Sequence, residues 1–436
     1  MSAVQGLVGN AELRKRILLT IALILVYRIG VHVPTPGVDG AVMTAFMNSK
    51  GGLFNLFNTF TGGALERFSV FALGIMPYIS ASIIFQLLTA VVPYLEALKK
   101  EGAQGQKKIN QYTRYATVAL SVIQGFGISS WLKSENFNGV PLVQSVFVGP
   151  IPFEVMTIIT LTAGTCFIMW LGEQISEKGI GDGASLIIFA GIAAGVPSGF
   201  TMSISLITSN QMSVITGLGL LLFMILTIAA IVYLETGQRR IPIQHSQRGV
   251  GRMSGQSSHL PLKLNLSGVI PPIFASSLLL FPATITQFVR VPWLQSIQES
   301  LNPSGTLYNI VFIALIVFFC FFYTEIVFNP TEVSDNLKKY GGFVPGVRAG
   351  KSTADYIQKV LDRLSVAGAA YLSAVCILPT LLIQSIGVPF YFGGTSLLIL
   401  VGVAINTSAK LQAYTYTQKY DGFVRGAKVR SRRVQF

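Results

Sequence analysis

Long apolar stretches alternate with short polar connections along most of the chain. A membrane-spanning helix needs about 20 mostly apolar residues, and ten stretches meet this requirement. Arg14, Lys15 and Arg16 precede the first stretch, but no small-residue cleavage site follows it, so we do not expect a cleaved signal peptide. The pattern predicts an all-α membrane protein whose ten transmembrane helices cover about residues 17–33, 70–92, 111–132, 152–172, 183–201, 212–234, 268–289, 307–328, 364–385 and 390–409.

The composition supports a membrane protein. Of 436 residues, 51% are hydrophobic and only 11% are charged, whereas soluble domains have about 25% charged residues. The chain nevertheless has 32 Lys and Arg against 18 Asp and Glu, a net charge of +14. This balance excludes a soluble acidic enzyme and a disordered tail. Cys166, Cys320 and Cys376 lie in apolar stretches without disulfide or metal spacing, which excludes a disulfide scaffold.

The basic residues orient the chain in the membrane. Almost all of them fall on the termini and on the loops that share a side with the termini. The exceptions are Arg28, inside the first span, and four residues on the opposite side, which are Lys50, Arg67, Lys133 and Arg290. Because basic loops stay on the cytoplasmic side, we expect both termini to be cytoplasmic.

Ten spans divide most simply into two halves of five, residues 1–205 and 206–436. An odd number of spans per half makes the halves run in opposite directions, as in inverted repeats. The second span of each half contains proline: Pro77 in one, and Pro271, Pro272 and Pro282 in the other. Interrupted spans at matching positions point to a functional path, so we expect span 70–92 to face span 268–289.

The segment 53–68 (LFNLFNTFTGGALERF) is too short and polar to span a membrane, and too apolar for a free loop. Irregular backbone at membrane depth survives only where protein or a water-filled cavity shields it. A re-entrant helix in a pore mouth and an interfacial helix on the outer surface remain equal alternatives.

The predicted spans contain few charged side chains and no catalytic or metal-binding set. Only Arg28 and Glu325 are charged within them, and both lie off-centre, whereas ion-coupled transporters keep ionisable groups at mid-membrane. This disfavours an inverted-repeat secondary transporter. No catalytic or metal-binding set is present, which disfavours a membrane enzyme, and no cofactor is expected. The glycines of 178–183 (KGIGDG) follow a span rather than a strand and indicate a tight turn, not a nucleotide site.

Five strings resemble, in order, the plug and helices of the SecY family of protein-conducting channels, and the resemblance runs from about residue 10 to 425. They are FNTFTGGALERFSVFALGIMPYISASIIFQLL (57–88), WLGEQISEKGIGDGASLIIFAGI (170–192), SSHLPLKLNLSGVIPPIFASSLLLFPATI (257–285), FFYTEIVFNPTEVSDNLKKYGGFVPGVRAG (321–350) and PFYFGGTSLLILVGV (389–403). The resemblance implies a plasma-membrane channel for signal-bearing, unfolded nascent polypeptides. Such a channel is closed by an apolar ring and a plug, and it opens sideways to release transmembrane helices into lipid.

The resemblance also assigns residues. It implies a pore ring of Ile75, Ile79, Ala184, Ile188, Ile273 and Ile399, where Ala184 replaces a bulky aliphatic that the family often has. Without it, each isoleucine would be read as a packing or lipid-facing residue. The plug corresponds to 53–66, with Phe57, Thr61, Gly62, Gly63 and Leu65. A lateral gate is implied between the second and third and the seventh and eighth spans, with Gln86, Gln124 and Asn265 as polar contacts.

The loops 235–266 and 329–363 correspond to docking sites for the SecA ATPase and the ribosome, through Arg239, Arg240 and Arg348. The same basic residues are also explained by topology alone, and basic loops favour ribosomal RNA phosphates. Gly341, Gly342 and Gly350 indicate exposed turns. The resemblance further implies the small subunits SecE and SecG. For Arg28 we expect a partner in a backbone carbonyl or a neighbouring half.

Overall fold

The computed structural model describes residues 11–50, 53–137, 139–143, 147–148, 150–245, 258–286, 305–386 and 393–426. Each predicted span overlaps a helix there, and residues 287–289 and 390–392 of two spans lie outside the described residues. The ten helices are α2 (Ala11–Gly30), α5 (Met76–Val91), α7 (Ala103–Ser134), α8 (Phe153–Lys178), α9 (Gly183–Thr208), α10 (Val214–Thr236), α11 (Ile270–Thr286), α13 (Thr306–Val327), α15 (Lys351–Ile386) and α16 (Gly394–Gly426). The predicted all-α membrane class is therefore correct.

Length and hydropathy distinguish these helices from one another. In the described part of the chain, seven are long and apolar enough to cross a membrane, or eight if the bent pair α5 and α6 (Pro93–Lys100) counts as one span. The bend between α5 and α6 is 96°. Two of the ten helices are not in this set. One is α2, which has three basic residues near its start, and the other is α11, which has only 17 residues.

The second span begins later than its hydropathy suggests. Residues 62–75 form turns, and α5 starts only at Met76, with Pro77 in its first turn. Gly62, Gly63 and Gly74 have φ of 67°, 87° and 57°, a region that residues with a Cβ rarely adopt. The apolar residues 70–75 therefore belong to the segment that leads into the helix, which corrects the predicted start at residue 70.

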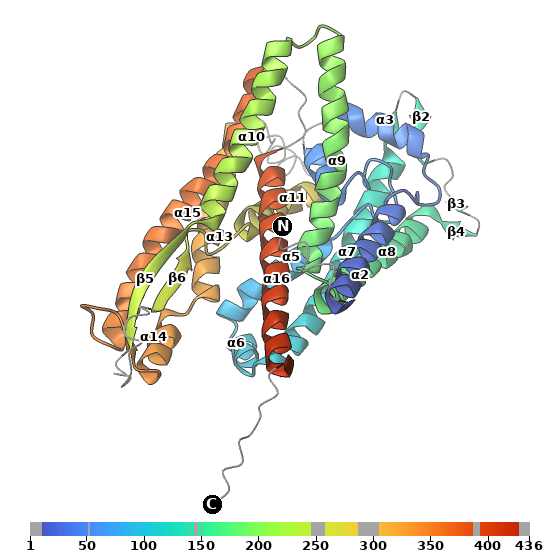
Figure 1. The fold of residues 1–436 in the computed structure, drawn as a ribbon. Helices are drawn as coiled ribbons and strands as arrows, with labels where there is room; N and C mark the ends of the chain where they lie inside the picture. The colour runs from blue at the N-terminus through green and yellow to red at the C-terminus, as the bar shows by residue number, and fades with distance from the viewer. Residues whose placement is uncertain are drawn as a thin grey trace, which may run out of the picture.

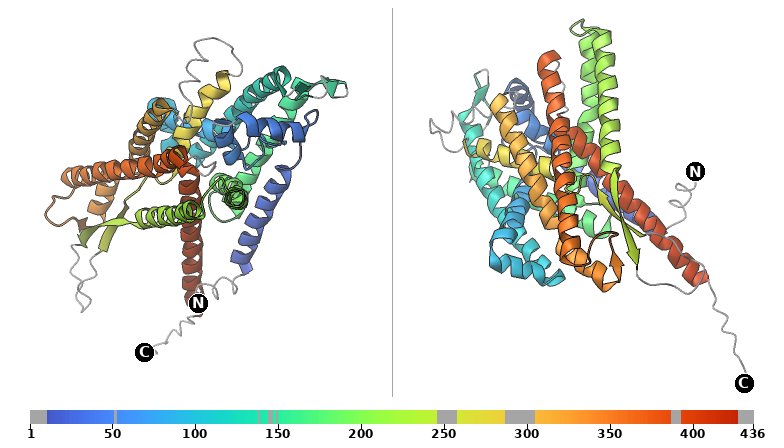
Figure 2. Two further views of the ribbon diagram at one scale, coloured as in Figure 1. Left: turned by 90° about the horizontal axis from the view of Figure 1, so that it is seen from above. Right: turned by 90° about the vertical axis from the view of Figure 1, so that its left-hand side faces the viewer.

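The two halves lie side by side, with α16 between them in the view of Figure 1. The helices α7 and α8 pack together in the first half, and α13 and α15 pack together in the second. Across the halves, α5 and α7 pack against α11, and α9 packs against α16. The contact of α5 with α11 confirms that the two proline-containing spans face each other. Figure 2 shows that the C-terminal part of α16 projects beyond the other helices.

The turn between α8 and α9 is as tight as its glycines predict. Only Gly179 to Asp182 separate the two helices, and the Asp182 carboxylate accepts a hydrogen bond from the Ser185 amide at the start of α9. A Cβ on Gly183 would lie 1.8 Å from the carbonyl oxygen of Gly172. Glycine is therefore required where α9 begins against α8.

The two polar loops of the second half form one small subdomain at one end of the bundle (Figure 1). It contains a three-stranded antiparallel sheet in the order β6 (Ser258–Lys263), β5 (Gln238–His245), β7 (Gly342–Phe343), and the helix α14 (Pro330–Lys339). Its own hydrophobic core consists of Ile241, Leu262, Val344, Ile357, Leu361 and Leu364.

The opposite end of the bundle carries α3 (Gly40–Lys50) and short hairpins (Figure 1). Their strands are β1 (Asn136–Phe137), β2 (Val140–Pro141), β3 (Phe147–Val148) and β4 (Ile151–Pro152). The main core runs between the two ends and draws side chains from both halves.

Candidate functional site

The five isoleucines of the expected ring all lie in the main core. Ile75 and Ile79 come from the start of α5, Ile188 from α9, Ile273 from α11 and Ile399 from α16, and none is more than 7% exposed. The Ile79 amide donates to the Ile75 carbonyl, which places these two residues one turn apart. The structure thus brings apolar side chains from both halves into one cluster at the centre of the molecule.

Ala184 is the least buried member of the expected ring, although it packs against the same core. Together with Ile75 it borders a cavity of about 250 Å³. The rest of the lining is largely polar and consists of Tyr78, Asn110, Arg114, Met169, Gly172, Glu173, Ser176, Glu177 and Asp182. Ala184 therefore lies between the main core and a polar pocket that α5, α7, α8 and α9 line.

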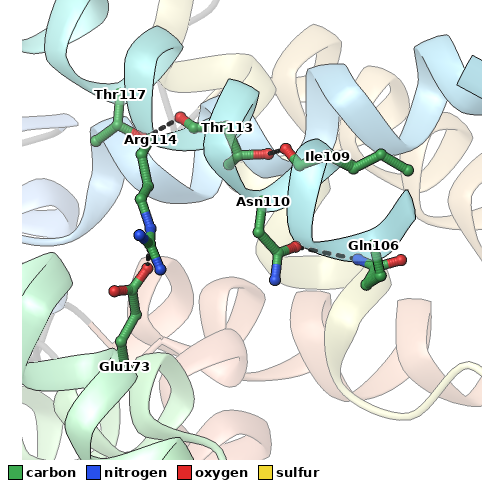
Figure 3. Close-up of polar contacts among 7 residues, drawn as sticks. All are labelled: Gln106, Ile109, Asn110, Thr113, Arg114, Thr117 and Glu173. Atoms are coloured by element: carbon green, nitrogen blue, oxygen red, sulfur yellow. Dashed lines mark hydrogen bonds and ion pairs between the residues drawn. The ribbon is translucent and has the colours of Figure 1, made fainter. Parts of the chain in front are cut away.

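An ion pair crosses this pocket from α7 to α8. The Arg114 Nε donates to Glu173 Oε1 at 2.7 Å, and Figure 3 shows the two side chains pointing toward each other. One turn earlier on α7, Gln106 donates to the side-chain oxygen of Asn110 at 3.0 Å. The Arg114–Glu173 ion pair joins two walls of the pocket through side chains that are 59 residues apart in the sequence. No local sequence pattern predicts such a contact.

The segment expected to be the plug is buried between the halves. Its helix α4 (Leu53–Thr61) packs against α9 of the first half and α11 of the second. Phe57, Thr61 and Leu65 are 8%, 1% and 4% exposed. A Cβ on Gly62 would lie 2.6 Å from the Cα of Gly191 in α9. This placement favours the re-entrant alternative, because a helix on the outer surface would keep one face exposed.

Hydrogen bonds to the plug backbone come from the end of α2. The hydroxyl of Tyr27 donates to the Thr61 carbonyl, and the Arg28 guanidinium donates to the Gly62 carbonyl, each at 3.0 Å. The expectation that Arg28 pairs with a backbone carbonyl is confirmed. The role of Tyr27 was not predicted, since a buried tyrosine in an apolar helix has no distinguishing signal.

Within the segment, Asn58 closes the chain on itself. Its amide nitrogen donates to the Glu66 carboxylate at 3.1 Å, and its amide oxygen accepts from the Glu66 backbone amide at 3.0 Å. These two hydrogen bonds close the turn that contains Gly62 and Gly63. The segment therefore has hydrogen bonds of its own in addition to those it accepts from α2.

The three expected gate residues are not joined to one another by hydrogen bonds. Gln86 on α5 donates to Ser82 at 3.3 Å, and the side-chain oxygens of Gln86 and Gln124 are buried without a partner in the described structure. An unsatisfied buried acceptor costs about 1–3 kcal/mol. Asn265 instead bonds within the second half, to Glu235 at 2.7 Å and Gly268 at 2.9 Å.

The expected docking residues all lie on the subdomain that the two polar loops form. Arg239 and Arg240 lie on β5, and Arg348 lies between β7 and α15. All three are exposed on the subdomain whose core joins the two loops. Gly341 and Gly350 have φ of 68° and 99° and form turns as predicted, whereas Gly342 is buried in β7.

Comparison with known proteins agrees with this architecture. A family model described as SecY matches residues 69–408. Proteins named "Protein translocase subunit SecY" from Pseudomonas aeruginosa and Escherichia coli K12 are each 46% identical, over 97% of this chain and 95% or 96% of the relative. The protein of the same name from Aquifex aeolicus is 42% identical over 95% of this chain and 97% of that one.

Solved structures share the fold at low sequence identity. One described as "The structure of a protein conducting channel" has a TM-score of 0.66 and 18% identity, and each chain is covered to 93%. Another, "Sec61 in the Canine ribosome-channel complex from the endoplasmic reticulum", has a TM-score of 0.64 and 17% identity, with the same coverage. The fold, the extent of the family match and the identity to its members together show that this multi-pass membrane chain belongs to the SecY family.

Proposed function

We propose that the chain forms a gated channel for unfolded polypeptides in the plasma membrane, with both termini in the cytoplasm. In this proposal it passes secretory polypeptides across the membrane and releases transmembrane helices sideways into lipid. The observation that carries the proposal is one apolar core that draws side chains from both halves and contains all five isoleucines, with a re-entrant segment packed against both halves. A branched apolar constriction excludes ions by dewetting and can part around a moving chain.

The plug role of residues 53–66 follows from their position. They touch α9 and α11, which carry ring residues of opposite halves, so the segment lies where it can close a path between the halves. Separation of the halves would remove one side of its packing and release it. Closure and opening are thereby linked to the same interface.

The side exit lies where α5 and α7 meet α11. The buried, unpartnered oxygens of Gln86 and Gln124 support this assignment, because they are acceptors that another group can satisfy. Polar contacts between membrane helices contribute only about 0.6–2 kcal/mol each. An inserting helix can therefore replace such contacts during release into lipid.

The partners are proposed from chemistry and from the family. The exposed Arg239, Arg240 and Arg348 are basic groups on one subdomain that suit the SecA ATPase and the ribosome, including its RNA phosphates. The solved ribosome-channel complex with the same fold supports this choice. SecE and SecG are the small subunits proposed to hold the two halves. The chain itself is proposed to be a passive channel rather than an enzyme.

Planar-bilayer recordings test the channel. We expect deletion of residues 53–66 to raise the resting ion conductance of the purified complex, because the seal then rests on the isoleucine ring alone. Deletion of residues 427–436, which lie outside the described residues, is the control and is expected to leave conductance unchanged. An unaltered conductance after the plug deletion would refute the plug, and failure of proteoliposomes to import a reporter preprotein would refute the channel.

A further inference from the structure

The hairpin that carries Arg239 and Arg240 is attached at both ends to membrane helices. Strand β5 follows α10 directly, and β6 leads into α11. At the base, Gln238 pairs with Lys263, and the Leu264 amide donates to the Gly237 carbonyl at 3.0 Å. The ends of α10 and α11 therefore meet at the root of the hairpin.

One side chain ties this root together. Asn265, 3% exposed, donates to the Glu235 carboxylate at 2.7 Å and to the Gly268 carbonyl at 2.9 Å. Its amide oxygen accepts from the Ser267 hydroxyl at 2.9 Å. An asparagine amide offers two donor hydrogens and one acceptor oxygen, so every group of this buried amide has a partner.

The network reaches two further helices. The Ser267 oxygen lies 3.3 Å from the Cys320 sulfur of α13, and that sulfur lies 3.6 Å from the Ser365 carbonyl of α15. The root is thus fixed against α13 and α15 as well as α10. Satisfied buried networks of this kind hold one arrangement of the surrounding elements.

Glu235 links Asn265 to α10. Of the hydrogen bonds that Asn265 makes, this is the one with a carboxylate partner. Glu235 comes from the last turn of α10, is half-buried, and accepts a charge-assisted hydrogen bond, a stronger type than a neutral one. Without it, the link from Leu264 to Val269 contains Gly268 at φ 62° and could bend independently of α10. With it, the hairpin, the end of α10 and the start of α11 form one body.

Helix α11 connects this body to the proposed pore ring and to the proposed side exit. Helix α11 begins at Ile270, carries Ile273 of the isoleucine cluster, and packs against α5 and α7. We propose that Glu235 is a positioning residue that holds Asn265, so that a partner docked on the β5–β6 hairpin moves α11 rather than bending the link. The inference rests on the proposed channel function and adds a residue that transmits docking to the gate.

The test compares docking with export in the complete complex, reconstituted in proteoliposomes with a SecA-type ATPase and a reporter preprotein. For Glu235→Ala we expect the affinity of the ATPase for the channel to stay within twofold of the wild type, while ATP-driven import falls at least tenfold. Glu235→Gln keeps an acceptor oxygen for Asn265 and is expected to retain import within threefold. Glu325→Ala, at the exposed cytoplasmic end of α13, is the matched control and is expected to behave as wild type.

The outcomes distinguish a failure of the positioning role of Glu235 from a failure of the proposed channel function. Normal import by Glu235→Ala would overturn the positioning role, and so would equal losses in the Gln and Ala variants. If Glu235→Ala does not accumulate, Glu235→Asp, which is one methylene shorter, replaces it, and normal import by that variant would also overturn the role. Failure of the wild-type complex to bind the ATPase or to import the reporter would instead overturn the proposed function.

Discussion

The guanidinium of Arg28 donates a hydrogen bond of 3.0 Å to the carbonyl oxygen of Gly62, and it thereby joins the end of α2 to the turn that follows α4. The neighbouring Tyr27 makes the same kind of bond to Thr61. Two consecutive residues of one helix thus hold two consecutive carbonyls of the buried segment. These two bonds attach the end of α2 to the proposed plug.

Removal of the Arg28 donor is expected to loosen the plug. Hydrogen bonds to charged groups contribute about 1.5–3 kcal/mol, and 1.4 kcal/mol corresponds to a tenfold change in an equilibrium. We expect Arg28→Met to raise resting ion conductance about tenfold in planar bilayers. The exposed Arg67, changed in the same way, serves as control. Equal conductance of the Arg28 variant and wild type would show that the bond does not hold the plug.

Gly62 and Gly63 form a matched pair for testing the packing of the plug. Both have positive φ, so alanine is strained at either position. Only at Gly62 would the new Cβ collide with α9, 2.6 Å from the Gly191 Cα, whereas Gly63 has no atom within 4 Å. We expect Gly62→Ala to increase ion leak several-fold more than Gly63→Ala. Similar leak from the two variants would argue against close packing of the plug on α9.

Ile188 tests the apolar ring. An asparagine at this 2% exposed position places an amide without partners in the main core and weakens the closed state. We predict that Ile188→Asn exports a reporter with a defective signal sequence at least several-fold faster than wild type does. Ile204→Asn makes the same change on the same helix at a 59% exposed position, and it should not relax discrimination. If the Ile188 variant still rejects the defective signal sequence as wild type does, Ile188 is not part of the ring.

Arg348 tests the docking surface. Charge reversal at this exposed position should repel the acidic or phosphate groups of a docked partner without disturbing a core. We expect Arg348→Glu to reduce ATPase-driven export at least tenfold while the protein stays inserted at normal levels. Lys107→Glu reverses another exposed charge, on α7 and outside both docking loops, and should export normally. Normal export by Arg348→Glu would eliminate this residue from the docking site.

Local chemistry was sufficient to predict several parts of the structure. The glycine run after Lys178 becomes the turn between α8 and α9, and the prolines of the second and seventh spans mark α5 and α11, which pack together. These features depend on backbone preferences and on hydropathy over a single helix length. For the same reason, Arg239, Arg240 and Arg348 could be expected on the surface before any fold was known.

Other parts could not be read from local pattern. The loops 235–266 and 329–363 contain a sheet whose β7 comes from a different loop from β5 and β6, and they share a core through Ile241 and Ile357. Asn265, expected at the gate, is held instead by Glu235, 30 residues earlier. Each of these contacts depends on which helices become neighbours, and hydropathy alone does not specify that choice.

The amino-acid sequence by itself determined the membrane class and where its helices fall along the chain, because transfer from water to lipid depends on the composition of one helix length at a time. The tertiary structure decided that α5 starts at Met76, that Phe57, Thr61 and Leu65 are buried in a segment packed against α9 and α11, and that Arg28 and Glu235 find their partners. In lipid, apolar helices gain little from hydrophobic association with one another, so close packing and hydrogen bonds between distant residues select their arrangement.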